Sequence, residues 1–518
     1  MSVRIPFEYL DKKQINQITK DLKIVEKTQI FGNQLYSDNK KIINFYRTAN
    51  NHVYLPYYYT TNLTGIHFPN NRLKKDRIES FEMSDNFELR DYQKEAIELA
   101  LEDMKKNGTC FFNVFCSFGK TVVGSWLASW ISKEHNLATL CIYPRHVIGK
   151  SWLGTFKNCT KAKIWKFDAN IEMPDDTQII LCMDTELEKL TPKILNRIGH
   201  LIIDEAHTFC TEGNINGLLN IEPKYITALT ATYERDDGFE VMLDFIVGKK
   251  RIVKISKKPF FVIHCQTPFV PVDIKTTTRG IQFNSLVDSL DNNELRNEFI
   301  YDIVYKNMSE KILIMTKHIE HVKILEINLK NILTKYNKKI STYCGNDKTY
   351  FECDVLIGTI SKIGVGFDEK ETCENWNGRR FNLLILSTST KKIEQIAGRV
   401  FRSDIPIVVD IVDDHENLKR HWTDRKRWYI SRNGIIHKTK TSFKWTELYH
   451  TLKNKHEKAE LIHKKDSLIP LHIDETKDLS SSIRSIKKAN KKADKETKNY
   501  SITLLNKYLP NLELEKKN

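Results

Sequence analysis

The sequence lacks several features that mark common classes of protein. No apolar run approaches the roughly 18 residues that a membrane-spanning helix requires. The first residues, MSVRIPFEYLDKK, hold a proline and charges where a secretory signal needs an apolar stretch. The ten cysteines show no C-x-x-C and no spacing typical of a zinc site, and no internal repeat is visible. The sequence therefore predicts an intracellular, cytoplasmic protein with no membrane partner and no structural metal, and it leaves a virion or nuclear location open.

Acidic residues are fewer than basic ones. The chain of 518 residues contains 66 Asp and Glu against 81 Lys and Arg, which gives a net charge of +15. An excess of this size favours a polyanionic partner, most often nucleic acid. The alternative is that lysine only keeps the surface solvated, and charge alone does not decide between the two.

Two series of short apolar runs predict a tandem α/β architecture. The first series is CFFNVF, TLCIYP, QIILCM, HLIIDE and YITALT, and the second is KILIMTK, KISTYCG, DVLIGTI, FNLLILS and PIVVDIV. Such runs between helical stretches indicate parallel strands that are covered on both faces. We predict a small strand-rich N-terminal unit (1–85), an ATP-binding α/β unit (86–250), a second α/β unit (251–415) and a basic C-terminal extension (416–518).

A strand, a loop and a helix follow one another in the pattern of a phosphate cradle. In such a loop, backbone N–H groups and the helix N-terminus face the anion. Lys120 would reach the β- and γ-phosphates, and the Thr121 hydroxyl would bind Mg²⁺. The motif departs from its usual form at two positions where glycine is common, Val114 and Ser117. The loop comprises Val114, Phe115, Cys116, Ser117, Phe118, Gly119, Lys120 and Thr121.

A second motif supplies two carboxylates. The apolar strand in HLIIDEAH ends in Asp204 and Glu205, downstream of the phosphate loop. Asp204 can hold the hydration shell of Mg²⁺, and Glu205 can polarise the attacking water. The alternative is a solvated acidic pair that caps the strand. Together with the loop, the pair predicts ATP and Mg²⁺ as ligands.

These motifs resemble those of superfamily 2 helicases of the DEAH type and occur in the order of that family. The stretch from Leu89 to Gln93 looks like the segment that reads adenine, with Arg90 beside the nucleotide and Gln93 on the base. The stretch 143–152 resembles the segment that follows the nucleic-acid backbone. Thr230 and Thr232, in Thr-Ala-Thr, match the motif that couples hydrolysis to strand movement in that family.

The continuation of this motif, LTATYERDDG, resembles a more specific branch. It is similar to the transcription and repair helicase of the eukaryotic general transcription factor and to its archaeal relatives. In that branch a charged loop assists duplex opening, and Arg235, Asp236 and Asp237 stand in its place here. The alternative is that Arg235 and Asp237 only pair with each other to hold the loop after Thr232.

The second apolar series carries two further motifs of the family. IGTISKIGVGFD resembles its fifth motif, which implies roles for Thr359 at nucleic acid and for Gly366 and Asp368 at the nucleotide. QIAGRVFR matches the pattern Q-x-x-G-R-x-x-R. We predict that its two arginines lie on one helix face and act as arginine fingers on the γ-phosphate. The alternative is a pair of surface arginines in ion pairs. The catalytic residues predicted here are Gln395, Arg399 and Arg402.

A basic stretch with aromatic residues follows, LKRHWTDRKRWYISRNG. Its cations can hold phosphates while its aromatic rings stack on bases. The helix can equally pack its tryptophans on the second core, and the sequence favours neither. The residues concerned are Lys419, Arg420, Arg425, Lys426 and Arg427 beside Trp422, Trp428 and Tyr429.

The resemblance implies two RecA-like units with ATP between them and a 3′–5′ helicase or translocase that acts on single-stranded and duplex DNA. The chain also looks like the transcript-release DNA helicases of poxviruses and other large cytoplasmic DNA viruses, which adds the transcription machinery as a partner and transcript release or repair as the role. Two alternatives stay open. One is an RNA-directed ATPase of the same superfamily, and the other is a non-catalytic nucleic-acid-binding module.

Overall fold

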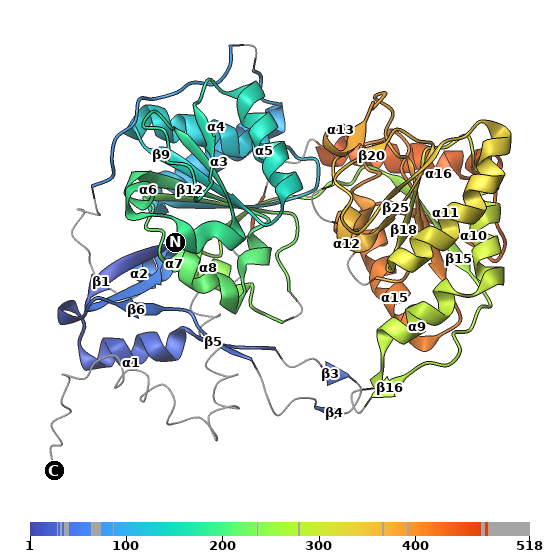
Figure 1. The fold of residues 1–518 in the computed structure, drawn as a ribbon, viewed down its shortest axis with the longest axis horizontal. Helices are drawn as coiled ribbons and strands as arrows, with labels where there is room; N and C mark the ends of the chain where they lie inside the picture. Colours follow the sequence, from blue (N-terminus) through green and yellow to red (C-terminus); the bar gives the residue numbers. More distant parts are fainter. Residues whose placement is uncertain are drawn as a thin grey trace. The chain divides into compact units, whose positions relative to one another are not determined.

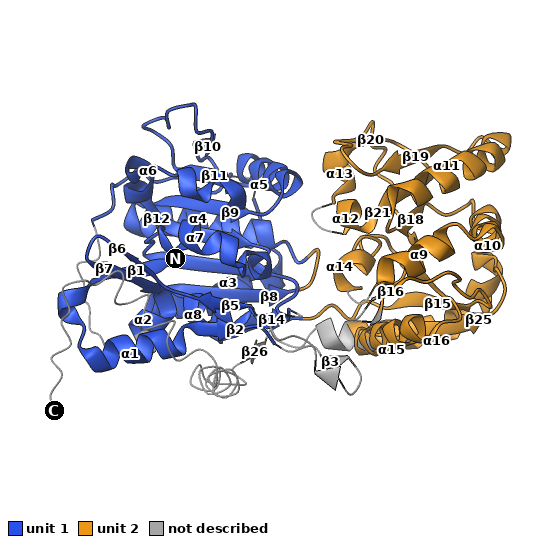
Figure 2. Ribbon diagram, turned by 60° about the horizontal axis from the view of Figure 1, so that its bottom comes forward, with its two compact units in different colours: residues 1–114, 118–254, 471–518 blue, residues 115–117, 255–470 orange. Residues whose placement is uncertain are grey.

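The computed structural model describes residues 1–27, 30–31, 34–35, 41–63, 74–85, 87–235, 237–277, 280–364, 367–390, 393–467 and 472–474. Two of the predicted site residues, Asp236 and Gly366, lie outside these ranges, as does the lysine-rich stretch 480–499. The chain divides into two compact units (Figure 2). Unit 1 comprises residues 1–114, 118–254 and 471–518, and unit 2 comprises residues 115–117 and 255–470. The division of the chain into four domains stays a prediction.

A parallel sheet forms the centre of unit 1 (Figure 1), in the strand order β10-β11-β9-β12-β13-β8-β14, with β26 antiparallel at its edge. The strands are almost continuously apolar and buried, as expected for a sheet with both faces covered. Their bounds are β8 Thr109–Val114, β9 Ala138–Tyr143, β10 Ile164–Lys166, β11 Ile179–Met183, β12 Ile198–Asp204, β13 Tyr225–Thr230, β14 Arg251–Lys254 and β26 His472–Asp474.

Helices alternate with the strands of this sheet along the chain. Helix α3 is capped at its C-terminal end by Gly108, whose φ of +74° is the left-handed conformation that favours glycine at a helix end. The helices are α3 Asp91–Asn107, α4 Lys120–His135, α5 His146–Cys159, α6 Pro192–Arg197, α7 Ile215–Leu219 and α8 Val241–Val247.

The N-terminal residues pack on the same core as this sheet. Ile5 and Leu55 lie in one apolar cluster with Leu201 and Phe245, and the rings of Tyr59 and Phe245 are 5.7 Å apart. The region contains an antiparallel sheet, β1-β7-β6, as the predicted strand content implies. Its elements are β1 Ser2–Pro6, α1 Lys12–Asp21, β2 Lys23–Val25, β3 Ile30–Phe31, β4 Gln34–Leu35, β5 Ile42–Asn44, β6 Arg47–Ala49, β7 His52–Pro56 and α2 Tyr57–Leu63.

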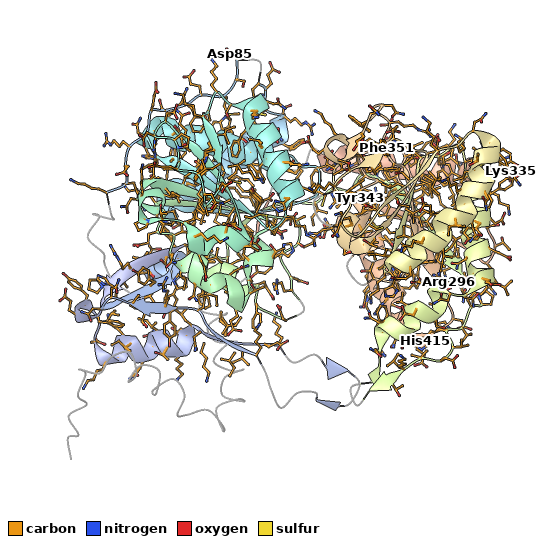
Figure 3. All side chains as sticks on the ribbon, viewed as in Figure 1. Asp85, Arg296, Lys335, Tyr343, Phe351 and His415 are labelled. Carbon is orange, nitrogen blue, oxygen red and sulfur yellow. The ribbon has the colours of Figure 1, made fainter. Side chains whose placement is uncertain are left out.

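Unit 2 is built on a second parallel sheet, in the order β19-β21-β18-β23-β24-β15-β25. Separate apolar clusters fill its two faces, and side chains fill the space between sheet and helices (Figure 3). The strands are β15 Phe260–Gln266, β18 Ile312–Thr316, β19 Ile340–Tyr343, β21 Val355–Thr359, β23 Leu383–Leu386, β24 Ile407–Val412 and β25 Gly434–Thr439, with the short β16 Thr276–Thr277, β17 Gly280–Ile281, β20 Tyr350–Phe351 and β22 Cys373–Glu374 outside the sheet. The helices are α9 Phe283–Asp291, α10 Glu294–Lys306, α11 Ile319–Leu333, α12 Ile360–Ile363, α13 Glu369–Thr372, α14 Glu394–Ala397, α15 Glu416–Ser431 and α16 Trp445–Ser467.

The predicted fold class, two tandem RecA-like α/β units, is confirmed. All ten predicted apolar runs contain a strand, five in each central sheet. Within the described ranges, no helix is both long enough and apolar enough to span a membrane. The same residues hold no cluster of three or more His, Cys, Asp or Glu side chains that could bind a metal ion.

The central strand β12 should dominate the stability of unit 1. Ile202 is fully buried there, whereas Ile171 is 57% exposed in the same unit. Ile202→Ala should lower the free energy of unfolding by about 2–5 kcal/mol, because it removes buried methylenes and leaves a cavity. Ile171→Ala should change it by less than about 0.5 kcal/mol. Urea unfolding of both variants tests this, and equal effects would contradict the assignment of β12 to the core.

Candidate active site

The loop between β8 and α4 holds two residues in the left-handed conformation. Ser117 has φ +78°, and Gly119, at the start of α4, has φ +90°. A serine in this conformation costs roughly 1–2 kcal/mol relative to glycine, which explains why glycine is common at this position. Val114 is a buried residue at the end of β8, so its side chain belongs to the core. Both departures from the usual motif are therefore accommodated by the fold.

Gln93 ties the beginning of α3 to this loop. Its side-chain oxygen accepts a hydrogen bond from the Arg90 backbone N–H at 3.0 Å, and its Nε2 donates to the Phe118 carbonyl at 3.0 Å. A Cβ atom at Gly119 would lie 2.4 Å from Nε2 of Gln93, so a larger residue there would displace the Gln93 amide as well as strain the backbone. The predicted contact of Gln93 with a base stays a prediction.

Asp204 stands at the end of β12 and is held from two sides. Its Oδ2 accepts a hydrogen bond from the Trp152 indole N–H at 2.8 Å, and its Oδ1 accepts one from the Glu205 backbone N–H at 2.9 Å. Burial and the neighbouring Glu205 raise the pKa of Asp204 to about 6, and Lys120 opposes that shift. Trp152 was expected in a segment along nucleic acid, but it is fully buried in α5. Its role in the structure is to orient a carboxylate.

Glu205 has one side-chain oxygen that the fold does not satisfy. Its Oε2 is buried and accepts no hydrogen bond from any described residue, and His207 Nδ1 lies 3.7 Å from it. The backbone of Glu205 is left-handed, with φ +50°. Buried polar atoms without partners are rare and call for a water molecule or a ligand. The arrangement fits a carboxylate that activates water, and it does not fit a solvated acidic pair.

His207 connects this carboxylate to the Thr-Ala-Thr motif. Its Nδ1 is 2.8 Å from Thr230 Oγ1, and its Nε2 is 3.4 Å from Thr232 Oγ1. Thr230 Oγ1 also donates to the Thr232 carbonyl at 2.6 Å. The sequence interpretation did not single out His207, although it stands two residues after Glu205 in HLIIDEAH. The contacts of His207 with Thr230 and Thr232 become visible only in the structure, where β12 and β13 lie side by side.

Arg235 and Asp237 pair with each other. The guanidinium donates to both carboxylate oxygens, at 2.9 and 2.5 Å, and its Nη1 donates to the His207 carbonyl at 2.7 Å. The Phe239 backbone N–H donates to the same carboxylate. Burial raises the pKa of Asp237, but Arg235 and the Phe239 N–H lower it more, so that it lies below its ordinary value. These contacts are the ones expected if Arg235 and Asp237 pair with each other to hold the loop after Thr232.

The predicted arginines of unit 2 do not lie on a helix face. Helix α14 ends at Ala397, so Arg399 and Arg402 follow it in turns, and that part of the prediction is wrong. Arg399 donates to the carbonyls of Gly364 and Phe367, both at 2.8 Å. Arg402 pairs with Asp368. The two motifs of unit 2 are therefore interlocked by these arginines.

The remaining predicted residues of unit 2 surround this contact. Burial raises the pKa of Asp368, but Arg402 and Arg380 outweigh it, and the pKa lies below its ordinary value. Gln395 Nε2 is buried and donates to no described residue. Thr359 is buried at the end of β21 and accepts a hydrogen bond from Ser361 Oγ at 3.1 Å.

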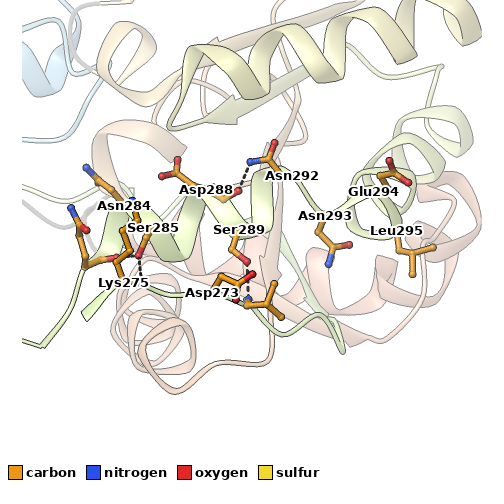
Figure 4. A pocket seen from close by; sticks show the side chains of 12 residues that line it. Asp273, Lys275, Asn284, Ser285, Asp288, Ser289, Asn292, Asn293, Glu294 and Leu295 are labelled. Atoms are coloured by element: carbon orange, nitrogen blue, oxygen red, sulfur yellow. Dashed lines mark hydrogen bonds between the residues drawn. The ribbon is translucent and has the colours of Figure 1, made fainter. Parts of the chain in front are cut away.

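A pocket of about 710 Å³ opens beside α9 in unit 2 (Figure 4). No predicted site residue lines it. Its charged side chains are three carboxylates and one lysine, so it does not suit a triphosphate. Its lining comprises Val272, Asp273, Lys275, Gln282, Asn284, Ser285, Asp288, Ser289, Asn292, Asn293, Glu294 and Leu295.

Comparison with known proteins shows which chains these motifs resemble. A family model described as "Type III restriction enzyme, res subunit" matches residues 86–235. A protein of invertebrate iridescent virus 6, named as a candidate helicase, is 28% identical over 376 residues, which cover 67% of this chain and 82% of that protein. These matches show that the chain is similar to helicases of superfamily 2.

Two further similarities complete the comparison. A protein of Acanthamoeba polyphaga mimivirus, named as a candidate ATP-dependent RNA helicase, is 23% identical and covers 71% of each chain. Among solved structures, S. cerevisiae Dbp5 bound to RNA and ADP BeF3 is 11% identical with a TM-score of 0.48, covering 69% of this chain and 92% of that one.

The left-handed serine gives a direct test of the phosphate loop. Ser117→Gly should leave the affinity for an ATP analogue within about threefold, because glycine adopts this backbone conformation freely. Ser117→Val should weaken binding by roughly 5- to 150-fold, because a β-branched residue pays about 1–3 kcal/mol there. Fluorescence titration with the analogue measures both. Unchanged binding by the valine variant would show that the loop does not hold phosphate.

Proposed function

We propose that the chain is an ATP hydrolase whose turnover drives movement along, or unwinding of, DNA. The observation that carries the proposal is the unsatisfied Oε2 of Glu205, buried next to Asp204. A carboxylate oxygen in this state can accept a proton from an attacking water molecule. Lys120, at the start of α4, would neutralise the phosphates.

The residues around Asp204 fit a bound Mg²⁺. Magnesium prefers oxygen ligands and is usually held by one or two carboxylates and by substrate phosphates. Asp204 and the Thr121 hydroxyl offer such oxygens, and the Trp152 indole fixes the carboxylate. Burial disfavours the charged form of Asp204, and a cation would reverse that effect. When bound, the ion would neutralise charge that develops on the phosphates.

In this proposal Gln395, Arg399 and Arg402 act on the γ-phosphate, a role that rests on the resemblance alone. Arg402 is paired with Asp368, so its guanidinium must exchange that partner for a phosphate during turnover. The exchange is feasible because Arg402 and Asp368 side chains are both about a quarter exposed, at 26% and 25%.

His207 supplies a physical link between hydrolysis and nucleic acid. Its ring touches Thr230 and Thr232 and lies beside Glu205. A shift of the Thr-Ala-Thr loop caused by nucleic acid would therefore move a ring that contacts the water-activating carboxylate. This arrangement supports a motor in which nucleic acid stimulates hydrolysis.

DNA is the favoured substrate because LTATYERDDG resembles the DNA-acting branch. Polarity from 3′ to 5′ and a role in transcript release or repair, with the transcription machinery as partner, follow from the same resemblance. The second candidate is an RNA-directed ATPase, which the name of the mimivirus relative favours. A non-catalytic module is disfavoured, because Ser117 adopts the backbone conformation that the loop requires.

Glu205→Gln tests the proposed chemistry. The carboxamide has the same shape but cannot take the proton, so turnover should fall by roughly 10²–10⁴-fold while ATP binding is kept. Glu234→Gln makes the same change at an exposed glutamate and should leave turnover unaltered. Steady-state hydrolysis and analogue binding, measured on both variants, check this. Turnover by Glu205→Gln near the wild-type rate would remove Glu205 from the mechanism.

Arg235→Ala tests whether the charged loop acts alone or through His207. The guanidinium holds the His207 carbonyl as well as Asp237, so we expect hydrolysis and strand separation to fall together. Glu234→Ala, on the exposed part of the same loop, is the matched control. ATPase and duplex unwinding are measured on one preparation. Selective loss of unwinding would instead make the loop a dedicated duplex-opening element.

A further inference from the structure

Helix α15 is the basic, aromatic stretch for which the sequence left nucleic-acid binding and core packing equally open. Trp422, Arg425 and Tyr429 are 8%, 1% and 0% exposed. The Trp422 ring stacks on His264 of β15, with ring centroids 3.8 Å apart and planes 9° from parallel. This face of α15 is therefore packed on the sheet of unit 2 and is closed to nucleic-acid bases.

Arg425 is the unusual member of this face, because a buried guanidinium is costly unless all its groups are satisfied. It makes a bidentate pair with Asp410 of β24, at 2.8 and 2.7 Å. Its Nη1 points to a different segment and donates to the Thr390 carbonyl at 2.6 Å and to Ser389 Oγ at 3.0 Å. An apolar residue could fill the same space, but it could not fix this backbone. His421, also on α15, contacts Ser389 Oγ at 3.1 Å.

The segment held by Arg425 leads directly into the motif QIAGRVFR. At the other end of the helix, Arg432 donates to Glu394 Oε1 at 2.7 Å, and Glu394 is the first residue of α14. The Trp428 ring lies parallel to that of Phe401, with centroids 6.2 Å apart and planes at 8°. Helix α15 thus contacts the stretch that carries Gln395, Arg399 and Arg402 at three places. Arg425 binds the residues before it, Arg432 binds its first residue, Glu394, and Trp428 packs on Phe401 within it.

We propose that α15 is a brace for this stretch, and that Arg425 and Arg432 are positioning residues for the three side chains that it carries. The inference rests on the proposed ATPase function for its catalytic consequence. Arginine fingers stabilise charge only when they are placed accurately, and a misplacement of about 1 Å can cost roughly 10²-fold in rate. The brace sets kcat and leaves the affinity for nucleic acid unchanged, because its own guanidinium groups face protein.

Arg425→Lys is the first test, because lysine keeps the charge for Asp410 but loses the fork that reaches Thr390 and Ser389. We expect kcat for ATP to fall at least tenfold, with KM for ATP and single-stranded DNA affinity within twofold of wild type. Arg427→Lys makes the same change at an exposed position of the same helix and should leave all three unchanged. A nucleic-acid helix would give the opposite result, with weaker DNA binding in the Arg427 variant.

A second variant guards against misfolding of the first. Arg432→Ala removes the contact with Glu394 and should lower kcat at least fivefold. The exchanged pair, Arg432→Glu with Glu394→Arg, should restore most of that loss. Unaltered kcat in both Arg425→Lys and Arg432→Ala would overturn the proposal.

Hydrogen exchange of residues 393–402 tests the brace independently of catalytic activity. Exchange there should rise at least tenfold in Arg425→Lys and not in Arg427→Lys, while β23 and β24 stay protected. Equal exchange in both variants would overturn the brace. If the wild-type chain fails to hydrolyse ATP, the proposed function falls with the catalytic role of the brace, and the exchange result still decides whether α15 holds the segment.

Discussion

The register of the parallel strands in unit 1 decides where the candidate site residues at the ends of these strands lie. Thr230 of β13 pairs with Asn113 of β8, and Asp204 of β12 pairs with Leu229 of β13. The phosphate loop, the carboxylates and the Thr-Ala-Thr motif therefore start at one edge of the sheet, although up to about a hundred residues separate them along the chain. A slip of one residue in any of these strands would turn its side chains to the opposite face. The register of three buried strands is thus the constraint on which the candidate site depends.

The second unit repeats this architecture but uses it differently. Three of its predicted site residues are engaged within the unit. Arg402 pairs with Asp368, and Arg399 donates to the carbonyls of Gly364 and Phe367. Two further arginines of unit 2, Arg296 (labelled in Figure 3) and Arg425, are also engaged within the unit, because each is buried and paired with an aspartate. Guanidinium groups that bridge a carboxylate and a backbone carbonyl fix loops more accurately than apolar contacts do, because their geometry is directional.

Much of this could be predicted from the sequence, since apolar runs mark the strands and short motifs mark the residues at their ends. Contacts between distant side chains could not. Trp152 and Asp204 are far apart in sequence, and nothing in either motif shows that the indole donates to the carboxylate. The end of α14 at Ala397 was missed because a pattern of two arginines three residues apart does not show where the helix stops. The burial of Arg425 could not be predicted either, because its partner Asp410 lies in the apolar run of β24, and the sequence does not show that the two side chains meet.

We propose that nucleic acid stimulates ATP hydrolysis through the carboxyl edge of unit 1, and that this nucleic acid is DNA. The most direct measurement is the steady-state ATPase rate of the full chain with Mg²⁺, compared without nucleic acid, with single-stranded DNA and with RNA of the same sequence. The account predicts strong stimulation by DNA and little by RNA. Stimulation by RNA alone would contradict the DNA assignment, and absence of hydrolysis under all three conditions would contradict the ATPase itself.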